Sequence, residues 1–347
     1  MRLPLSLGYF LVMLDVTAVT VAVPDVQRSL DASPEAVRWS VDGYSAVFAA
    51  LLLVGGALGD RLGHRRVYLA GLAVFTGASV VCAVAATPGA LISGRLLQGA
   101  GAALLVPASL ALLSAVYPDR AVRARALGFW AGVAGVAFAA GPVLGGVLVQ
   151  GVSWRAVFWL NVPVTALAVV LTLRRVPVVS RVKRASLVPL SLFTNARFTA
   201  TAVIGVLLNL GYYGMLFVAT LYFQQQRGFD AMTTGLMLLP TACTALVAGP
   251  VSGRLTARYG PYEPMTAALL LGAAGFLGWL VAGPDTPYPA LLFALVVTGL
   301  ATPLTVPAAT AAIIESAPAD RAGVASAVFN VSRQIGNAAG GALFGAL

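Results

Sequence analysis

Long apolar stretches separated by short polar gaps dominate the chain of 347 residues. A bilayer core of about 30 Å needs about 20 helical residues to cross it, and the apolar stretches have this length. Pro and Gly mark gaps such as Thr87–Gly89 and Gly283–Asp285. The pattern predicts eleven membrane-spanning helices, at residues 5–24, 41–58, 67–86, 90–116, 125–149, 156–173, 197–223, 232–256, 265–282, 288–314 and 322–346.

The composition agrees with this pattern. Hydrophobic residues make up 59% of the chain and charged residues 10%, whereas a soluble globular protein is about 25% charged. So few charges cannot cover a water-facing surface, which excludes a soluble enzyme, a disordered chain and a nucleic-acid-binding domain. The predicted fold class is an all-α polytopic membrane protein, with the lipid bilayer as its surroundings and no nucleic acid as partner.

The basic residues point to an orientation in the membrane. The 22 Lys and Arg residues outnumber the 12 Asp and Glu residues, and most of them lie in alternate gaps, as the positive-inside rule requires for a cytoplasmic N-terminus in a cell membrane. The lone lysine, Lys183, is not in a Gly-Lys-Ser/Thr sequence, which argues against ATP-driven transport. Cys82 and Cys243 stand far apart in apolar runs, so neither a metal nor a cofactor is expected.

The two halves of the chain resemble each other at an offset of about 200 residues. Residues 106–108 and 306–308 both read Val-Pro-Ala, and residues 56–63 and 253–260 share Gly-x-Leu-x-x-Arg-x-Gly. Two bundles of one design can rock around a site near the midplane, as in secondary transporters. We therefore expect a six-helix N-terminal bundle at 1–174, a basic cytoplasmic linker at 175–196, and a C-terminal bundle at 197–347 with five helices, apparently truncated.

The gap between the second and third spans has an unusual sequence. A tight loop with one acid, several arginines and glycines suits a cytoplasmic hinge, in which Asp60 can hold a helix N-terminus in one state only. Its arginines can pair with acids on a neighbouring helix. The alternative is that the loop is basic only because it faces the cytoplasm, which would explain its arginines but not Asp60. His64, the only histidine, is interpreted as incidental. The candidate gating residues are Gly59, Asp60, Arg61, Gly63, Arg65 and Arg66.

Two ionisable residues fall within predicted spans and are the strongest functional candidates. Asp15 lies near the middle of the first span, where a carboxylate is costly and should face a polar cavity or a partner. There it can exchange a proton or attract a cationic substrate; the alternative is a structural hydrogen bond shared with Thr17. Arg95, on the outer side of the fourth span, shares a helix face with Gln98. The alternative for Arg95 is snorkelling to the outer interface.

Small residues form a stripe along the fifth predicted span. They recur at steps of three and four residues, which places them on one helix face and lets another helix approach closely. Pro142 either kinks this helix or frees a carbonyl. The stripe predicts a tight seal between the two bundles, although ordinary packing of membrane helices would use it equally well. Its members are Gly128, Gly132, Gly135, Ala139, Pro142 and Gly146.

Polar and aromatic residues inside otherwise apolar spans are candidates for a substrate cavity. A cavity with aromatics and few fixed hydrogen-bonding groups suits bulky hydrophobic or cationic compounds, whereas lipid-facing aromatics at the interfaces are the alternative. Arg333 with Asn330 and Gln334 either lines the cavity or caps its outer end. The candidates are Gln98, Phe129, Trp130, Asn209, Tyr212, Tyr213, Gln224, Gln225, Asn330, Arg333 and Gln334.

The loop at residues 56–66 resembles the signature of the major facilitator superfamily, with His64 where a basic residue is usual. Other segments resemble the drug–proton antiporters of this superfamily, especially their fourteen-helix subfamily. The resembling segments are Leu14–Pro24, Arg95–Gly101, Trp154–Pro163, Ser191–Phe198, Leu221–Gln225, Phe329–Gly336 and an antiporter motif with Gly132, Gly135, Gly141, Pro142, Gly145 and Gly146. The resemblance implies two pseudo-symmetric helical bundles and a role of Arg95 in proton coupling.

The chain departs from that subfamily in two places. A basic loop stands where the subfamily has two extra central helices, and the final helix is also expected to be absent. Loss of a helix pair leaves every later span correctly oriented.

The leading hypothesis is a monomeric, proton-coupled exporter of hydrophobic or cationic drugs or natural products that works by alternating access, with protons and a small-molecule substrate as its partners. The alternatives are an importer or metabolite carrier of the same fold, and a truncated membrane protein that does not transport. A membrane enzyme is the least favoured reading, because the sequence has no intramembrane histidine pair and no nucleophile–base set.

Overall fold

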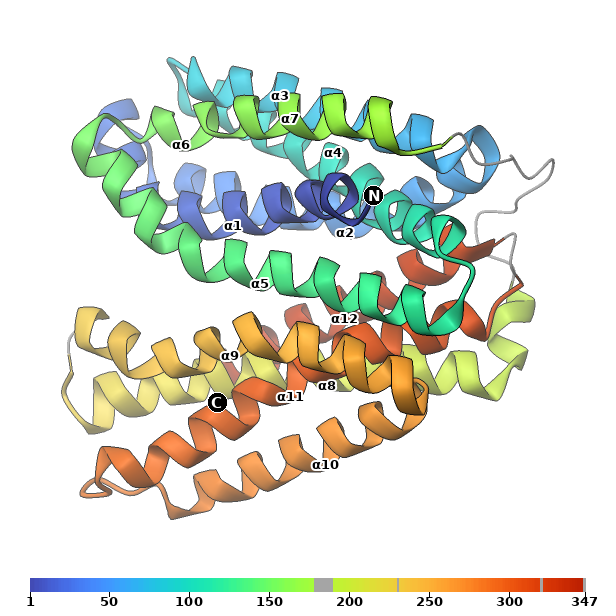
Figure 1. Ribbon diagram of the computed structural model, residues 1–347. Helices are drawn as coiled ribbons and strands as arrows, with labels where there is room; N and C mark the ends of the chain where they lie inside the picture. Colours follow the sequence, from blue (N-terminus) through green and yellow to red (C-terminus); the bar gives the residue numbers. More distant parts are fainter. Residues whose placement is uncertain (178–189, 230, 319–320, 346–347) are drawn as a thin grey trace. The chain divides into compact units, whose positions relative to one another are not determined.

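The computed structural model describes residues 1–177, 190–229, 231–318 and 321–345, and within these ranges it contains helices and no strand (Figure 1). Residues 178–189 of the predicted linker lie outside the described residues. The helices are α1 (Arg2–Leu30), α2 (Pro34–Leu62), α3 (His64–Ala83), α4 (Pro88–Val116), α5 (Arg120–Gly151), α6 (Arg155–Trp159), α7 (Asn161–Arg175), η1 (Leu190–Thr194), α8 (Ala196–Leu221), η2 (Tyr222–Gln226), α9 (Ala231–Tyr259), α10 (Tyr262–Gly278), η3 (Trp279–Val281), α11 (Tyr288–Glu315) and α12 (Ala322–Gly345).

The helices follow the predicted spans. In the described part of the chain, ten helical segments are long and apolar enough to cross a membrane, and α12 covers the eleventh predicted run. Most helices extend a few residues beyond the apolar run at each end, since a backbone that leaves the hydrocarbon core can keep its internal hydrogen bonds. The predicted all-α polytopic membrane fold is confirmed.

Local sequence signals set several helix ends. Ser33 caps α2 by accepting a hydrogen bond from Ala36 N at 3.2 Å, and Thr87 caps α4 by accepting one from Ala90 N at 3.2 Å. Each cap is followed by a proline at the first helical position, where a missing N–H has no cost. The helices α2 and α9 both end at a glycine with positive φ, Gly63 at 95° and Gly260 at 85°, a conformation that other residues adopt only with strain.

The residues form two compact units. The first contains Met1–Pro118, Val136–Pro189 and Pro318–Val328, and the second contains Asp119–Gly135, Leu190–Ala317 and Phe329–Leu347. The long helices α5 and α12 therefore each contribute one part to the first unit and the other part to the second. The predicted domain boundaries at residues 174 and 197 stay predictions.

Each unit pairs its helices in the same way. In the first unit α4 packs against α1, α2 and α3, and in the second α11 packs against α8, α9 and α10. The repeated Val-Pro-Ala lies inside the central helix each time, with Pro107 in α4 and Pro307 in α11. Because order, pairing and the positive-φ glycines all correspond, the repeat predicted from the sequence is confirmed. The first unit also places α7 against α1 and α3.

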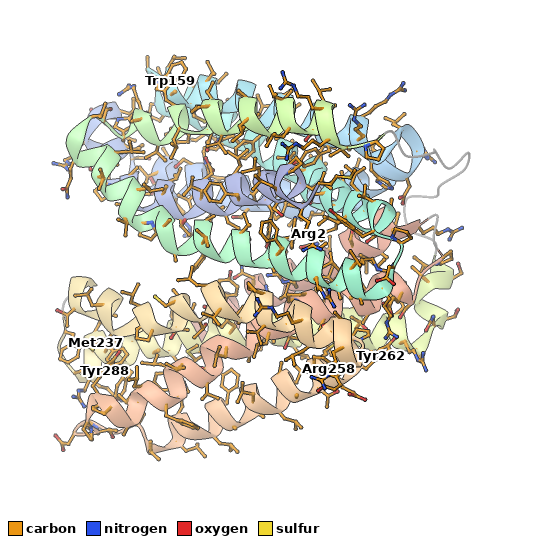
Figure 2. The ribbon with its side chains drawn as sticks, in the orientation of Figure 1. Arg2, Trp159, Met237, Arg258, Tyr262 and Tyr288 are labelled. Atoms are coloured by element: carbon orange, nitrogen blue, oxygen red, sulfur yellow. The ribbon has the colours of Figure 1, made fainter. Side chains whose placement is uncertain are left out.

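Each unit has a hydrophobic cluster of its own. One apolar cluster of the first unit joins α1, α3, α4 and α6 through residues such as Val19, Leu91 and Phe158. The corresponding cluster of the second unit is aromatic, with Tyr222 and Phe223 packed beside Tyr288. Figure 2 labels Tyr288 near Met237, and the Tyr288 hydroxyl donates to the Met237 carbonyl at 2.9 Å. Ionic groups in the interior are concentrated in the first unit, where the site described next is found.

Candidate functional site

Asp15 is at the centre of a buried polar network in the first unit. It lies midway along α1 and is 1% exposed. Its Oδ2 accepts a hydrogen bond from Arg95 Nη1, and its Oδ1 accepts from Gln98 Nε2 at 3.0 Å and from Asn161 Nδ2 at 2.9 Å. Three donors around one carboxyl group match the ionised form, which only accepts hydrogen bonds. The alternative partner, Thr17, instead donates to the Met13 carbonyl at 3.0 Å.

Arg95, which α4 contributes, is buried beside Asp15. Its side chain is 2% exposed, so the snorkelling alternative is wrong; the physical reason is that a buried carboxylate offers the guanidinium a partner that the interface does not. Arg95 Nε donates to the Ser40 carbonyl at 2.9 Å. The guanidinium also lies over the Tyr44 ring, 4.4 Å from its centroid, a favourable cation–π arrangement. The side chain is thus held by α1 and α2 as well as by its own helix.

Gln98 and Ser79 complete the network. Gln98 Oε1 accepts from Arg95 Nη1 at 2.8 Å, and Gln98 Nε2 donates to Ser79 Oγ at 2.8 Å. Asn161 Nδ2 reaches the same hydroxyl at 3.2 Å. Because Asn161 is the first residue of α7 and Ser79 lies on α3, the network ties α1, α3, α4 and α7 together.

The close packing of α2 on α4 depends on a glycine. A Cβ added at Gly99 would lie 2.5 Å from the Tyr44 carbonyl oxygen, so only a residue without a side chain fits there. This close approach brings the Ser40 carbonyl and the Tyr44 ring within reach of Arg95. Sequence reasoning identified Asp15, Arg95 and Gln98, but it missed Tyr44, Ser79 and Asn161. The available signal was a polar residue, Asn161, near the start of an otherwise apolar span.

Asp60, the acid of the candidate gating loop, contacts the start of α12. It is 1% exposed, and its two carboxylate oxygens accept from Gly323 N at 3.2 Å and Val324 N at 3.1 Å. These N–H groups belong to the first turn of α12, where a helix has no internal acceptors and a negative charge is favourable. All three residues lie in the first unit. The predicted contact of Asp60 with a helix N-terminus is present in this structure.

The other residues of the candidate gating loop differ in their contacts. His64 Nε2 lies 3.2 Å from Asp60 Oδ1, and a Cβ at Gly59 would lie 2.5 Å from His64 Nδ1. Gly63 supplies the positive φ between α2 and α3. Arg65 Nη2 donates to the Leu173 carbonyl near the end of α7 at 3.0 Å. Arg61 and Arg66 are exposed.

We expect Asp60→Ala to lower the stability of the protein by about 1–2 kcal/mol, because α12 loses its capping acceptor and a favourable charge at its N-terminus. Thermal unfolding of the purified protein in detergent measures this. The matched control is Asp119→Ala, since Asp119 also accepts from a first-turn N–H, that of Val122 at 2.8 Å, but at an exposed position. Equal and small losses for both variants would contradict the structural role of Asp60.

Small residues of α5 pack against two different helices. Gly132 and Gly135 lie against α9, where an added Cβ would be 2.8 Å from Pro250 Cγ and 2.7 Å from the Ala245 carbonyl oxygen, respectively. Gly141 and Gly145 lie against α1, at Thr17 and Ala18. Gly146 has open space around it, and α5 continues as a helix through Pro142. The close approach predicted for the stripe is therefore present toward α9, whereas the approach to α1 involves Gly141 and Gly145 of the antiporter motif, which are not members of the stripe.

The predicted cavity residues do not form one cluster. Arg333 Nε donates to Asn209 Oδ1 at 3.4 Å, which joins α12 to α8. Tyr212 and Tyr213 pack edge to face, with centroids 5.4 Å apart, and Tyr212 lines an apolar cavity of about 300 Å³ among α8, α10 and α11. The others differ in exposure: Trp130 and Asn330 are buried, Gln334 is half-buried, and Phe129, Gln224 and Gln225 are exposed. Gln98 belongs to the Asp15 network. The assignment of these residues to a substrate cavity stays a prediction.

Comparison with known proteins identifies relatives over nearly the whole chain. The chain is 35% identical to the methylenomycin A resistance protein of Bacillus subtilis (strain 168), with 99% of this chain and 86% of that protein covered. It is 33% identical to the tetracenomycin C resistance and export protein of Streptomyces glaucescens, with 99% and 75% covered. The first alignment runs over 400 residues, more than the 347 of this chain, so that relative has residues within the matched region that lack a counterpart here.

Solved structures share the fold. The transporter FucP, solved in an outward conformation, matches with a TM-score of 0.80 at 14% identity, covering 99% of this chain and 91% of that one. The family model described as Major Facilitator Superfamily matches residues 5–341. The relatives named above are proteins of drug resistance and export, and the neighbouring structure is a transporter. This chain, a multi-pass membrane protein with two units of the same helix pairing, belongs to the major facilitator superfamily.

Proposed function

We propose that the protein is a proton-coupled exporter of hydrophobic or cationic drugs or natural products, and not an enzyme. It would work as a monomer in the plasma membrane with its N-terminus in the cytoplasm, like the fourteen-helix antiporters that its motifs resemble. The drug-resistance proteins among its relatives support the substrate class. The positions of the arginines between spans support the orientation.

The observation that carries the proposal is the buried pair of Asp15 and Arg95. An ion pair without net charge can remain in a dry interior when each partner is hydrogen-bonded. Protonation of Asp15 removes one charge and leaves Arg95 as an uncompensated buried cation, which is strongly unfavourable in the arrangement described here. The protonated protein would then favour a different arrangement of its helices. A proton can shift the equilibrium between two conformations only if it binds more tightly to one of them than to the other.

The same pair offers a route to substrate coupling. In the arrangement described here, Arg95 neutralises Asp15, so a cationic substrate gains little from the carboxylate. A state in which Arg95 moved away would expose a carboxylate to which either a proton or a cation can bind. Competition between the two ligands for one carboxylate gives exchange if the protein changes orientation only when one of them is bound, because each ligand must then leave before the other can bind.

The proposal is tested in inverted membrane vesicles from cells that produce the protein. When respiration acidifies the vesicle interior, we expect a cationic dye such as ethidium to accumulate inside. Nigericin, which collapses the pH gradient, should release it. Membranes without the protein are the control. Accumulation that persists after nigericin would contradict proton coupling.

The same vesicles separate the two alternatives. Counterflow of a sugar or an organic acid without any dye movement would favour an importer or metabolite carrier of this fold. Folded protein that moves neither kind of compound would favour a membrane protein that does not transport.

A further inference from the structure

A polar cavity lies at one end of the second unit, whereas the Asp15 network belongs to the first unit. Its volume is about 330 Å³. It is formed where α5, α8 and α10 begin and α11 ends. Figure 2 labels Tyr262 near Arg258, which marks this end of the unit at the turn from α9 to α10. The lining residues are Arg120, Asn195, Arg197, Tyr262, Glu315 and Ser316.

Positive charge exceeds negative charge around this cavity. Arg120 Nε and Arg123 Nη2 lie 3.3 Å and 3.2 Å from the same oxygen of Glu315, Oε1. The Arg197 guanidinium faces the Tyr262 ring, 5.4 Å from its centroid, and it has no ion pair with any residue that the structure describes. Glu315 is thus shared by two guanidinium groups, and Arg197 adds a further positive charge to the lining of the cavity. Among the lining residues, Arg120 and Arg197 outnumber Glu315, and both arginines are exposed, so an anion can reach them from solution.

Neutral polar groups also line the cavity. The Tyr262 and Ser316 hydroxyls lie 3.5 Å apart at the cavity. The amide of Asn195 is held beside them by a 3.0 Å hydrogen bond to the Ser316 carbonyl.

We propose that this cavity binds a negatively charged phosphate group. A guanidinium presents a planar fork of N–H donors that matches two phosphate oxygens, and Arg197 is the residue with that fork unengaged by a carboxylate. Arg120 would contact the same phosphate from the start of α5. A bound phosphate would therefore connect α5 to α8 and α10 within the second unit.

The phosphate group can come from two sources. Arg120, Arg123 and Arg197 all belong to the gaps predicted to face the cytoplasm, where the membrane leaflet contains anionic phospholipids. A phospholipid headgroup is one source, and free phosphate from the cytoplasm is the other. The two are separated by presenting each alone to the full chain.

The test uses the purified protein in a neutral detergent. Binding of phosphatidylglycerol is counted by native mass spectrometry, with phosphatidylcholine as the uncharged reference lipid. Binding of inorganic phosphate is followed as a rise in Tm against sodium chloride at equal ionic strength. We expect one of the two probes to bind saturably to the wild type. Saturable phosphatidylglycerol binding identifies a headgroup site, saturable inorganic phosphate binding identifies a free-anion site, and saturable binding of neither overturns the proposal.

Variants localise the binding to the cavity. Arg197→Gln should weaken binding of the active probe about tenfold, as the loss of one charge-assisted contact predicts. The matched control is Arg258→Gln, which removes the same charge from an exposed position at the same end of the unit, outside the cavity. Glu315→Gln should tighten binding several-fold, because it removes the negative charge from the lining of the cavity and the ion pair of Arg120. Equal affinities for Arg197→Gln and Arg258→Gln, or weaker binding for Glu315→Gln, would overturn the assignment.

Discussion

Asp15→Asn is expected to abolish dye accumulation driven by the pH gradient. The substitution keeps the shape of the side chain and an oxygen that accepts a hydrogen bond, but it removes the group that ionises. Arg95, whose side chain is 2% exposed, is left without a counter-charge. Loss of one partner from a buried ion pair typically costs about 3–5 kcal/mol, so the variant should also unfold at a lower temperature. Vesicle transport and thermal unfolding measure the two effects separately.

A double variant distinguishes loss of coupling from loss of stability. In Asp15→Asn/Arg95→Gln both charges are absent, and neutral amides can keep part of the hydrogen-bond network around Gln98 and Asn161. We expect this protein to recover much of the lost stability, because no uncompensated charge remains buried. Proton-driven transport should not return, since nothing in the network can then exchange a proton.

The matched control for Asp15 is Asp25→Asn on the same helix. Asp25 pairs with Arg28 at 2.8 Å on the exposed side of α1, where an ion pair contributes about 0–1 kcal/mol. This variant should transport and unfold like the wild type. If Asp15→Asn kept a transport activity that still collapsed with nigericin, Asp15 would not be the proton-coupling group. If the double variant were no more stable than the single one, the ion pair would not explain the loss.

Much of the fold was predictable because the bilayer leaves few choices. An apolar run of about 20 residues must form a helix, since no water satisfies its backbone groups. Repeated short sequences such as those ending at Gly63 and Gly260 predict a repeated backbone conformation, and both residues have positive φ. The helix ends were less predictable, because hydropathy marks the hydrocarbon core and not the caps. Ser33 and Thr87 lie outside the predicted spans and yet determine where α2 and α4 begin.

The candidate site was predictable residue by residue but not as a network. Asp15 and Arg95 were identified because charges within membrane spans are costly. Their pairing depends on which faces of α1 and α4 meet, and a hydropathy pattern with little amphipathicity does not specify those faces. Ser79 and Tyr44 carry no sequence signal of their own, since similar residues occur singly in many apolar helices. They become part of the site only through the close packing of α2, α3 and α4.

The stripe on α5 shows the same limit in a different form. Its spacing predicts a close helix approach, and that approach is present. The spacing does not say which helix approaches. The first half of the stripe contacts α9, and α1 is approached by Gly141 and Gly145, which belong to the antiporter motif and not to the stripe. The contact with α1 is at Thr17 and Ala18, directly beyond Asp15 along the helix. The antiporter motif thus lies against the helix that provides the carboxylate.

Substitution of adjacent glycines of this motif should give very different results. In Gly145→Val the new Cβ would lie 2.9 Å from the Ala18 carbonyl oxygen and 3.0 Å from its Cα. Backbone atoms cannot rotate away as a side chain can, so α1 and α5 must separate. Overpacking of this kind costs about 1–3 kcal/mol. Because α1 also positions Asp15 against Arg95, we expect a lower Tm together with at least a severalfold loss of proton-driven dye accumulation.

Gly146→Val is the control for this substitution, because a Cβ at Gly146 would meet no atom within 4 Å. Both variants place the same β-branched residue in the same helix, so any effect on helix propensity is common to the two and cancels in their difference. We expect Gly146→Val to keep nearly wild-type Tm and transport, and Gly145→Ala to fall between the wild type and Gly145→Val. If both valine variants lost stability equally, helix propensity would explain the loss and the contact with α1 would not. If Gly145→Val unfolded earlier but transported normally, the close approach would be needed for packing alone, and the position of α1 against α5 would have no part in coupling.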